Sequence, residues 1–251
     1  MPSSETALEK LLLRIVPRLS QEWEGAPASE IAQIESIAGR PLPELYVWFL
    51  SHLGRSMGGM QYPTIDFSAR AILSAYAARQ IEPHPRFLLI GHEHDEVSPL
   101  HYFYDLESPA RADALVVRML TPKDESHEQF ETFREMLAWG ELWSRRVEGA
   151  PQQCQGRLHC PGGALHAELW PVLSRLGFEA PIETGAFCGL YERSDAALIC
   201  TGTPNEASDS QAFGLGGLDA GTLGKLLSTL ATESSIDIRL STWSPPLPSA
   251  S

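Results

Sequence analysis

The stretch of sequence that decides the fold runs from residue 28 to residue 54 and reads ASEIAQIESIAGRPLPELYVWFLSHLG. Its first part predicts a helix, because isoleucines recur at positions 31, 34 and 37 with helical spacing. Ser29 is the predicted cap, and Glu30 suits the positive end of the helix dipole. Gly39 can take the left-handed conformation that closes a helix, and Pro41 prevents its continuation.

The second part of this stretch predicts another helix. Pro43 is favourable at a helix start, and Gly54 follows the last apolar position. We expect one face of this helix to be buried, and the residues assigned to that face are Leu45, Trp48, Phe49, His52 and Leu53. Tyr46 is likewise interpreted as a core residue.

The sequence predicts another helix before these two helices and a sheet after them. Residues 5–19 have the apolar spacing of an amphipathic helix that Pro17 ends early. Strands are expected at residues 86–91, 100–106 and 113–120, followed by a helix over about 125–145. Helices, then a strand meander, then a closing helix indicate an α+β domain with an antiparallel sheet over residues 1–148.

A second, smaller α+β unit is predicted after a linker. Residues 149–154 have the composition of a linker, and residues 155–245 form the second unit. We expect helices near 164–176 and 219–232 and strands near 155–159, 185–192, 196–203 and 236–241. The Pro/Ser-rich tail, residues 246–251, is expected to fray.

The segment from Ala28 to Leu53 resembles the most recognisable part of the SUKH immunity superfamily. The matching features are an acidic helix start, a stop at Gly39, the pair Leu42-Pro43 and an aromatic-rich helix. The similarity extends over about residues 20–145 and includes Asp105-Leu106 at a strand end and Phe130-x-x-Phe133. Two departures stand out: Leu53-Gly54 replaces the usual Asn-Gly, and residues 92–96 replace a glycine-rich turn.

The resemblance implies a non-enzymatic, cytoplasmic immunity protein that binds and neutralises a cognate bacterial toxin without a cofactor. Many toxins inhibited by this superfamily are nucleases. The formal net charge of −13 fits such a partner, because a nuclease site that holds phosphates is positively charged. The same charge disfavours direct binding of nucleic acid. Homodimerisation and a regulatory scaffold role without a toxin stay open as alternatives.

Acidic side chains are the candidate partner-binding residues. The densest polar cluster, residues 92–96, has the sequence His-Glu-His-Asp-Glu and is expected to be a loop. A second group, which consists of Glu128, Glu131 and Glu135, is expected on one face of the closing helix. The candidates are Glu93, Asp95, Glu96, Asp105, Glu128, Glu131 and Glu135.

A small hydrolase is the alternative function. Residues 54–58 match the G-x-S-x-G pattern around Ser56, but a helix precedes it where a nucleophile elbow needs a strand. His92 and His94 would share a face in an extended chain, which is a possible two-histidine metal arrangement. The third ligand would have to come from elsewhere in the sequence, and His101 is a candidate. Gly214–Gly217 is interpreted as a capped turn before a helix that begins near Asp219. We therefore predict no catalytic residue and no metal ligand.

The cysteines and the hydropathy pattern predict a cytoplasmic protein. Four cysteines, Cys154, Cys160, Cys188 and Cys200, form no C-x-x-C pair, and we expect buried reduced thiols. One disulfide stays open as an alternative. The early acid Glu5 and the short Leu11–Leu13 run argue against a signal peptide, and no run is long enough to span a bilayer.

Overall fold

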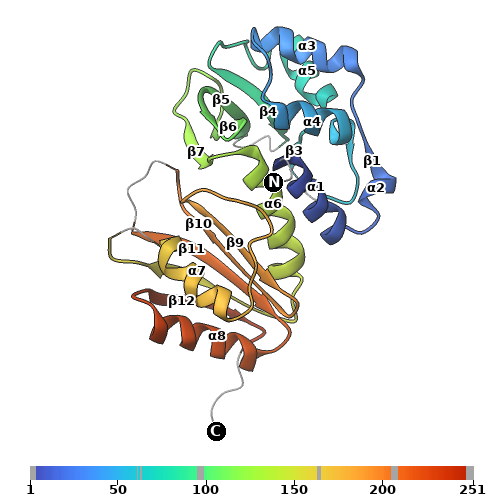
Figure 1. Ribbon diagram of the computed structural model, residues 1–251. Coiled ribbons are helices and arrows are strands. Elements are labelled where there is room, and N and C mark those ends of the chain that lie inside the picture. The colour runs from blue at the N-terminus through green and yellow to red at the C-terminus, as the bar shows by residue number, and fades with distance from the viewer. Residues whose placement is uncertain are drawn as a thin grey trace. The chain divides into compact units, whose positions relative to one another are not determined.

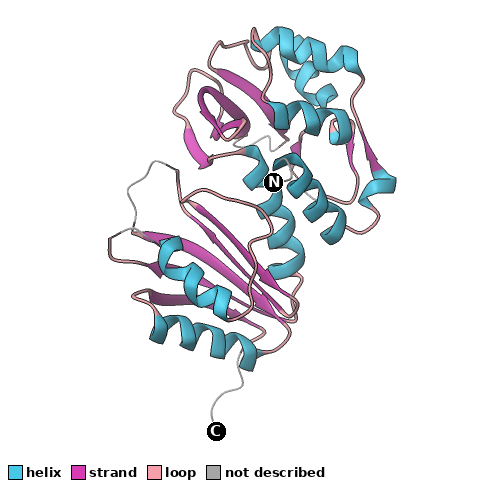
Figure 2. Ribbon diagram, in the orientation of Figure 1, coloured by secondary structure: helices cyan, strands magenta, loops and turns pink. Residues whose placement is uncertain are grey.

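The computed structural model describes residues 4–60, 62, 64–94, 99–162, 165–204 and 209–246. The chain divides into two compact units, residues 3–137 and 138–251, and the division falls within helix α6 (Phe133–Leu142). Each unit combines helices with an antiparallel sheet, so the predicted α+β class is confirmed (Figures 1 and 2). The division lies upstream of the predicted boundary at residue 148.

The N-terminal unit begins with four helices, α1 (Ser4–Ile15), α2 (Leu19–Glu22), α3 (Ala28–Ala38) and α4 (Glu44–Leu53). The chain turns between α1 and α2, where Pro17 cannot continue a helix. Gly39 ends α3 with a φ of 66°, the left-handed conformation expected of it. Pro27 occupies the N-cap position of α3, so the prediction that Ser29 caps this helix was wrong.

A five-stranded antiparallel sheet follows, in the order β3-β4-β5-β6-β7. Its strands are β3 (Ile65–Asp66), β4 (Phe87–Glu93), β5 (His101–Ala110), β6 (Asp113–Met119) and β7 (His127–Phe130). The predicted strands at 86–91, 100–106 and 113–120 are therefore confirmed as β4, β5 and β6. A short ribbon pairs β1 (Trp23–Glu24) with β2 (Ser56–Met57). Figure 1 shows α3, α4 and α5 (Ala69–Ala77) gathered beside the sheet.

The core of the N-terminal unit is an aromatic cluster. Tyr46 stacks near Phe49 and meets Tyr104 edge-on at 5.2 Å between ring centroids. Phe133 contacts three of these rings, and its closest neighbour is Phe49 at 4.9 Å. All four side chains are fully buried. Edge-to-face geometry at these separations adds to the free energy of burial, so the cluster joins α4, the sheet and α6.

The predicted closing helix over 125–145 was wrong at its start. Residues 127–130 form the edge strand β7, and the helical part comprises α6 and a π-helical extension, η1 (Trp143–Glu148). Asp113 marks where α6 begins, because its carboxylate accepts a hydrogen bond from the backbone N–H of Arg134 at 3.0 Å. Burial raises the pKa of Asp113 to about 6, despite hydrogen bonds from Tyr104 and from the backbone.

The C-terminal unit contains a second five-stranded antiparallel sheet, in the order β12-β8-β11-β10-β9. Helices α7 (Leu165–Arg175) and α8 (Ala220–Glu233) cover one face of it (Figures 1 and 2). A core of leucines, cysteines and aromatic residues lies on that face. The strands are β8 (Gln152–His159), β9 (Cys188–Arg193), β10 (Ala196–Thr201), β11 (Ser210–Gly217) and β12 (Asp237–Ser244). Because β8 begins at Gln152, the predicted linker 149–154 belongs partly to the sheet.

The glycine-rich segment 214–217 is the end of strand β11, so its interpretation as a turn was wrong. These glycines bring the sheet close to η1. A side chain at Gly214 would collide with the Trp143 ring, and one at Gly216 would collide with the backbone carbonyl of Arg146. The absence of Cβ atoms is therefore a packing requirement here. Asp219 caps α8 by accepting a hydrogen bond from the backbone N–H of Thr222 at 2.8 Å.

None of the four cysteines forms a disulfide, and all four are buried, as predicted. Burial raises the pKa of Cys154 to about 12. Burial likewise raises the pKa of Cys200 far above its ordinary value. A thiol that resists ionisation is a poor nucleophile, so these two cysteines act as small apolar residues of the second core.

Gly216→Val should destabilise the protein by about 1–3 kcal/mol, because the new side chain forces η1 away from β11. Gly224→Ala in α8 is the matched control, since a Cβ at Gly224 meets nothing within 4 Å. That control should stabilise the helix by about 0.5–1 kcal/mol. Urea unfolding followed by circular dichroism measures both changes. Equal stability of the two variants would contradict the packing role of Gly216.

Candidate partner-binding surface

Helix α4 has two chemically different faces. Its buried face packs into the core and consists of Leu45, Tyr46, Phe49, Leu50 and Leu53. The remaining positions follow helical spacing on the opposite side, which we call the outer face of α4, and they are Glu44, Val47, Trp48, Ser51 and His52. Tyr46, Leu45, Phe49 and Leu53 are core residues as predicted, whereas Trp48 and His52 belong to the outer face.

An aromatic ladder lies on this outer face. The His52 ring stacks on Trp48, with 5.2 Å between centroids and 26° between planes. The His52 ring also meets Trp23 edge-on at 5.6 Å. The ring nitrogen Nδ1 of His52 lies 2.8 Å from the Trp48 carbonyl oxygen, which fixes the orientation of the imidazole. All three rings are partly exposed, and Val47 beside them is 39% exposed.

The backbone around Gly25 holds Trp23 against α4. The N–H of Ala26 donates to the carbonyl of Leu50 at 2.8 Å, so the chain runs directly along the last turn of the helix. A Cβ at Gly25 would collide with the carbonyl oxygen of Ser51. The ladder therefore depends on a residue without a side chain at position 25. Exposed carboxylates flank it at Glu44 and at Glu24, which lies 3.4 Å from Arg55.

This arrangement is suited to binding a protein. Tryptophan is enriched among interface residues that contribute most of the binding free energy, because it buries a large rigid surface. Two partly exposed tryptophans and Val47, with acidic residues at the margin, match that composition. The face could have been found in the sequence, since Glu44, Val47, Trp48 and Ser51 share helical spacing and include two polar residues.

Asp105, a predicted contact residue, is instead buried in the sheet. Its carboxylate accepts two hydrogen bonds from the Arg86 guanidinium, at 2.9 and 2.7 Å. Burial acts to raise the pKa of Asp105, but the hydrogen bonds from Arg86, Glu107 and Ser108 outweigh it and lower that pKa. With its side chain only 2% exposed, Asp105 holds β4 and β5 together and cannot offer a contact area to a partner.

The acids predicted on the closing helix lie on different elements. Glu128 is on strand β7, Glu131 follows that strand, and Glu135 is inside α6, so the prediction that they share a helix face was wrong. Glu135 is fully buried and lies 2.5 Å from Arg111, which also pairs with Glu131 at 3.2 Å. Glu128 and Glu131 are partly exposed.

Glu93 is also buried, near the end of β4. Its carboxylate accepts a hydrogen bond from Thr64 at 3.2 Å and lies 3.7 Å from Arg118. Asp95 and Glu96 lie outside the described residues. Of the seven predicted acids, the structure therefore buries Glu93, Asp105 and Glu135. Their basic partners are distant in the sequence, which is why spacing alone gave no indication of burial.

Three histidines, His92, His94 and His101, gather at the end of β4 and the start of β5. The ring of His92 stacks on His101 at 4.6 Å and meets His94 at 5.2 Å. Nevertheless, no group of three histidine, cysteine or acidic side chains within the described residues is arranged to hold a metal ion. His101 has a structural partner, because its Nδ1 accepts a hydrogen bond from the backbone N–H of Glu93 at 3.0 Å.

The G-x-S-x-G segment forms part of the β1–β2 ribbon. The Ser56 hydroxyl donates to the carbonyl oxygen of Glu22 at 3.2 Å and accepts from the N–H of Gly58 at 3.2 Å. The first hydrogen bond joins the ribbon to the end of α2, and the second stabilises the turn that follows Ser56. Ser56 therefore has a structural role in the ribbon, in a setting unlike a strand–serine–helix elbow.

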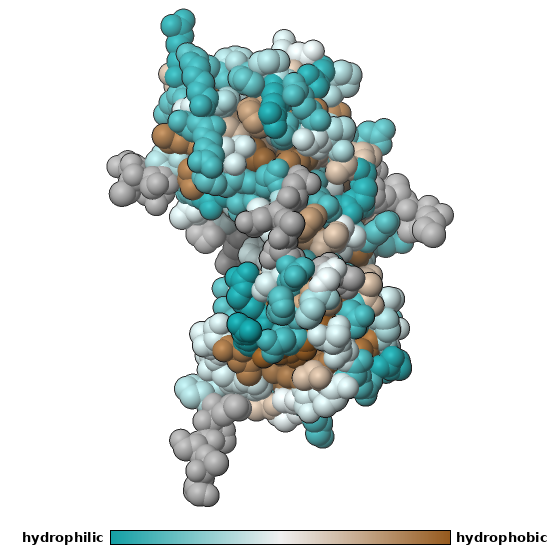
Figure 3. All heavy atoms as spheres, turned by 90° about the vertical axis from the view of Figure 1, so that its left-hand side faces the viewer, coloured by the Kyte–Doolittle hydropathy of each residue, from teal (hydrophilic) through white to brown (hydrophobic). Residues whose placement is uncertain are grey.

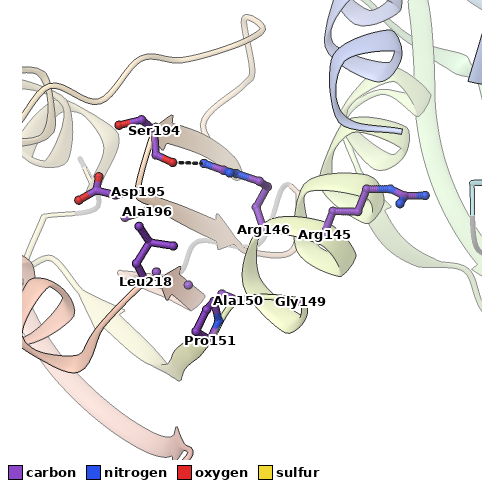
Figure 4. A pocket seen from close by; sticks show the side chains of 11 residues that line it. Arg145, Arg146, Gly149, Ala150, Pro151, Ser194, Asp195, Ala196 and Leu218 are labelled. Atoms are coloured by element: carbon purple, nitrogen blue, oxygen red, sulfur yellow. Dashed lines mark hydrogen bonds between the residues drawn. The ribbon is translucent and has the colours of Figure 1, made fainter. Parts of the chain in front are cut away.

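A small cavity of about 130 Å³ in the C-terminal unit is lined by η1 and the β9–β10 turn (Figure 4). Arg146 reaches across it and donates to the carbonyl oxygens of Arg193 and Ser194, while Arg145 points away from it. The Arg146 guanidinium thereby joins η1 to the sheet. We assign this cavity a structural role.

Comparisons with known proteins add no relative: neither a family model nor a curated protein matches this chain. Among the described residues, no helix has both the length and the apolar character needed to cross a membrane. The face shown in Figure 3 mixes hydrophilic and hydrophobic residues over the N-terminal unit.

Stability should fall as the pH is lowered from about 6.5 towards 4, because His101 is held neutral in the folded protein. Burial, with repulsion from His92, lowers the pKa of His101 to about 4. The unfolded chain therefore binds this proton first, at a pKa of about 6.5, and the loss reaches about 3 kcal/mol below pH 4.

His101→Asn, whose amide oxygen can accept from the Glu93 N–H, should flatten this part of the pH profile. The measurement is urea unfolding at pH 7, 6, 5 and 4 for both proteins. The raised pKa of Asp113 makes its contribution to stability increase as the pH falls from about 6 to 4. Because Asp113 is present in both proteins, this contribution cancels in the comparison. Parallel profiles for the two proteins would rule out His101 as the cause.

Proposed function

We propose that this chain is an immunity protein that binds and neutralises a cognate bacterial toxin. The observation that carries the proposal is the outer face of α4, with its ladder of Trp23, His52 and Trp48 and the exposed Val47. This helix belongs to the segment whose sequence resembles the SUKH superfamily. A binding surface on it agrees with the protein-binding role that the resemblance implies.

Charge supports a basic partner. The chain carries 32 acidic and 19 basic residues. A negative protein attracts a positively charged one over long range and raises the rate of encounter. A nuclease toxin has the required positive surface around its phosphate site. We therefore propose that the apolar ladder supplies affinity, while exposed acids such as Glu24 and Glu44 favour basic partners.

Co-expression with the toxin encoded by the adjacent gene tests the proposal. Growth should be restored, and the two proteins should co-purify as a stable complex. The association rate should fall as the salt concentration rises, because exposed charges are screened. Failure both to form a complex and to restore growth would refute the immunity function.

Trp48→Ala should weaken the complex by roughly 30-fold or more, which corresponds to the loss of about 2 kcal/mol typical of a central interface tryptophan. The measurement is isothermal titration calorimetry, with circular dichroism to confirm an intact fold. Trp170→Ala is the matched control, because Trp170 is also exposed, at 41%, but lies on α7 of the other unit. Equal affinities for the Trp48→Ala variant and the unmodified protein would place the interface elsewhere.

A further inference from the structure

The C-terminal unit has a cavity of about 350 Å³ on the sheet face opposite α7 and α8. Its floor comes from neighbouring strands, because Thr201, Ala212 and Arg157 lie directly opposite one another in the register of β10, β11 and β8. Residues directly opposite in an antiparallel sheet share a face. Gln155 and Ser241 complete the polar part of the lining.

Two stacked indole rings form the wall of this cavity. Trp139 and Trp143 are one helical turn apart, with 5.4 Å between ring centroids and 16° between planes. Trp143 lies against Gly214, where a Cβ would collide with its ring. The absence of a side chain at Gly214 therefore allows the Trp143 indole to pack directly on the sheet. Both rings are only partly buried, so the wall offers flat apolar surface to a bound molecule.

The polar groups of the lining select the charge of the ligand. Arg157 is the one charged residue among the described residues that line the cavity, and no carboxylate does. Its Nε donates to the hydroxyl of Ser210 at 3.1 Å, which orients the guanidinium on the exposed sheet face. Thr201 and Ser241 add hydroxyl groups. In a protein of net charge −13, a lining of this kind is distinctive, because it favours an anion locally.

We propose that this cavity binds a planar aromatic anion, whose ring lies against the Trp139–Trp143 wall and whose acidic group pairs with Arg157. The volume is within the range of small-molecule sites in proteins, which are mostly apolar with a few oriented polar groups. The site is independent of the partner surface on α4. It assigns a ligand-binding role to the C-terminal unit.

Isothermal titration calorimetry with 2-naphthoate tests this site in the full-length protein. We expect saturable binding of one molecule per chain, and at least fivefold weaker binding of neutral 2-naphthamide. Arg157→Gln should reduce the affinity for 2-naphthoate at least fivefold and leave that for 2-naphthamide unchanged. Arg175→Gln is the control, because Arg175 is exposed on α7 and paired with Glu233.

Ala212→Phe provides a second test that keeps the tryptophans intact. Ala212 is exposed and lines the cavity, so the larger ring should fill the site and abolish binding of both probes. A peptide with a C-terminal phenylalanine tests whether the ligand is a free small molecule or the end of a protein chain. Tighter binding of this peptide than of 2-naphthoate would indicate a chain terminus. Absence of saturable binding, or binding that Arg157→Gln and Ala212→Phe leave unchanged, would overturn the proposal.

Discussion

The packing of Tyr46 and Phe49 against Phe133 and Tyr104 is the constraint on which the N-terminal unit depends. These rings fix the rotation of α4 about its own axis, because turning the helix would expose several fully buried aromatic side chains. The same rotation determines which residues face outward. The ladder of Trp48 and His52 is thus a consequence of the core, and its geometry needs no partner to form it.

Internal electrostatics explain why the acidic surface is smaller than the composition suggests. The buried carboxylates of Asp105 and Glu135 are paired with Arg86 and Arg111, whose guanidinium groups reach the surface. Removing one partner of such a pair leaves an uncompensated charge inside the protein, which is strongly unfavourable. These carboxylates therefore contribute to the integrity of the sheet. Attraction of a basic partner depends on the exposed acids that remain.

Local patterns predicted most of the helices and strands, but they could not predict what tertiary contacts decide. The isoleucine spacing and Gly39 were sufficient for α3, and Leu45 and Phe49 for the core side of α4. Residues 69–77 gave no expectation of α5, although Ser68 caps it by accepting from the Ala71 N–H. The need for glycine at residues 214–217 follows only from the packing of η1 against β11. Glu135 could not be recognised as buried, because its partner Arg111 is distant in the sequence. The outer face of α4 was missed because Trp48 and His52 were assigned by helical spacing to the buried face.

The central claim is that the outer face of α4, rather than the acids at 93–105 and 128–135, contacts the partner. Hydrogen–deuterium exchange of the chain with and without the proposed toxin tests this most directly. The account predicts that binding slows exchange in peptides covering residues 23–26 and 44–53. Protection confined to peptides covering residues 87–106 and 127–135, with 44–53 unchanged, would contradict it.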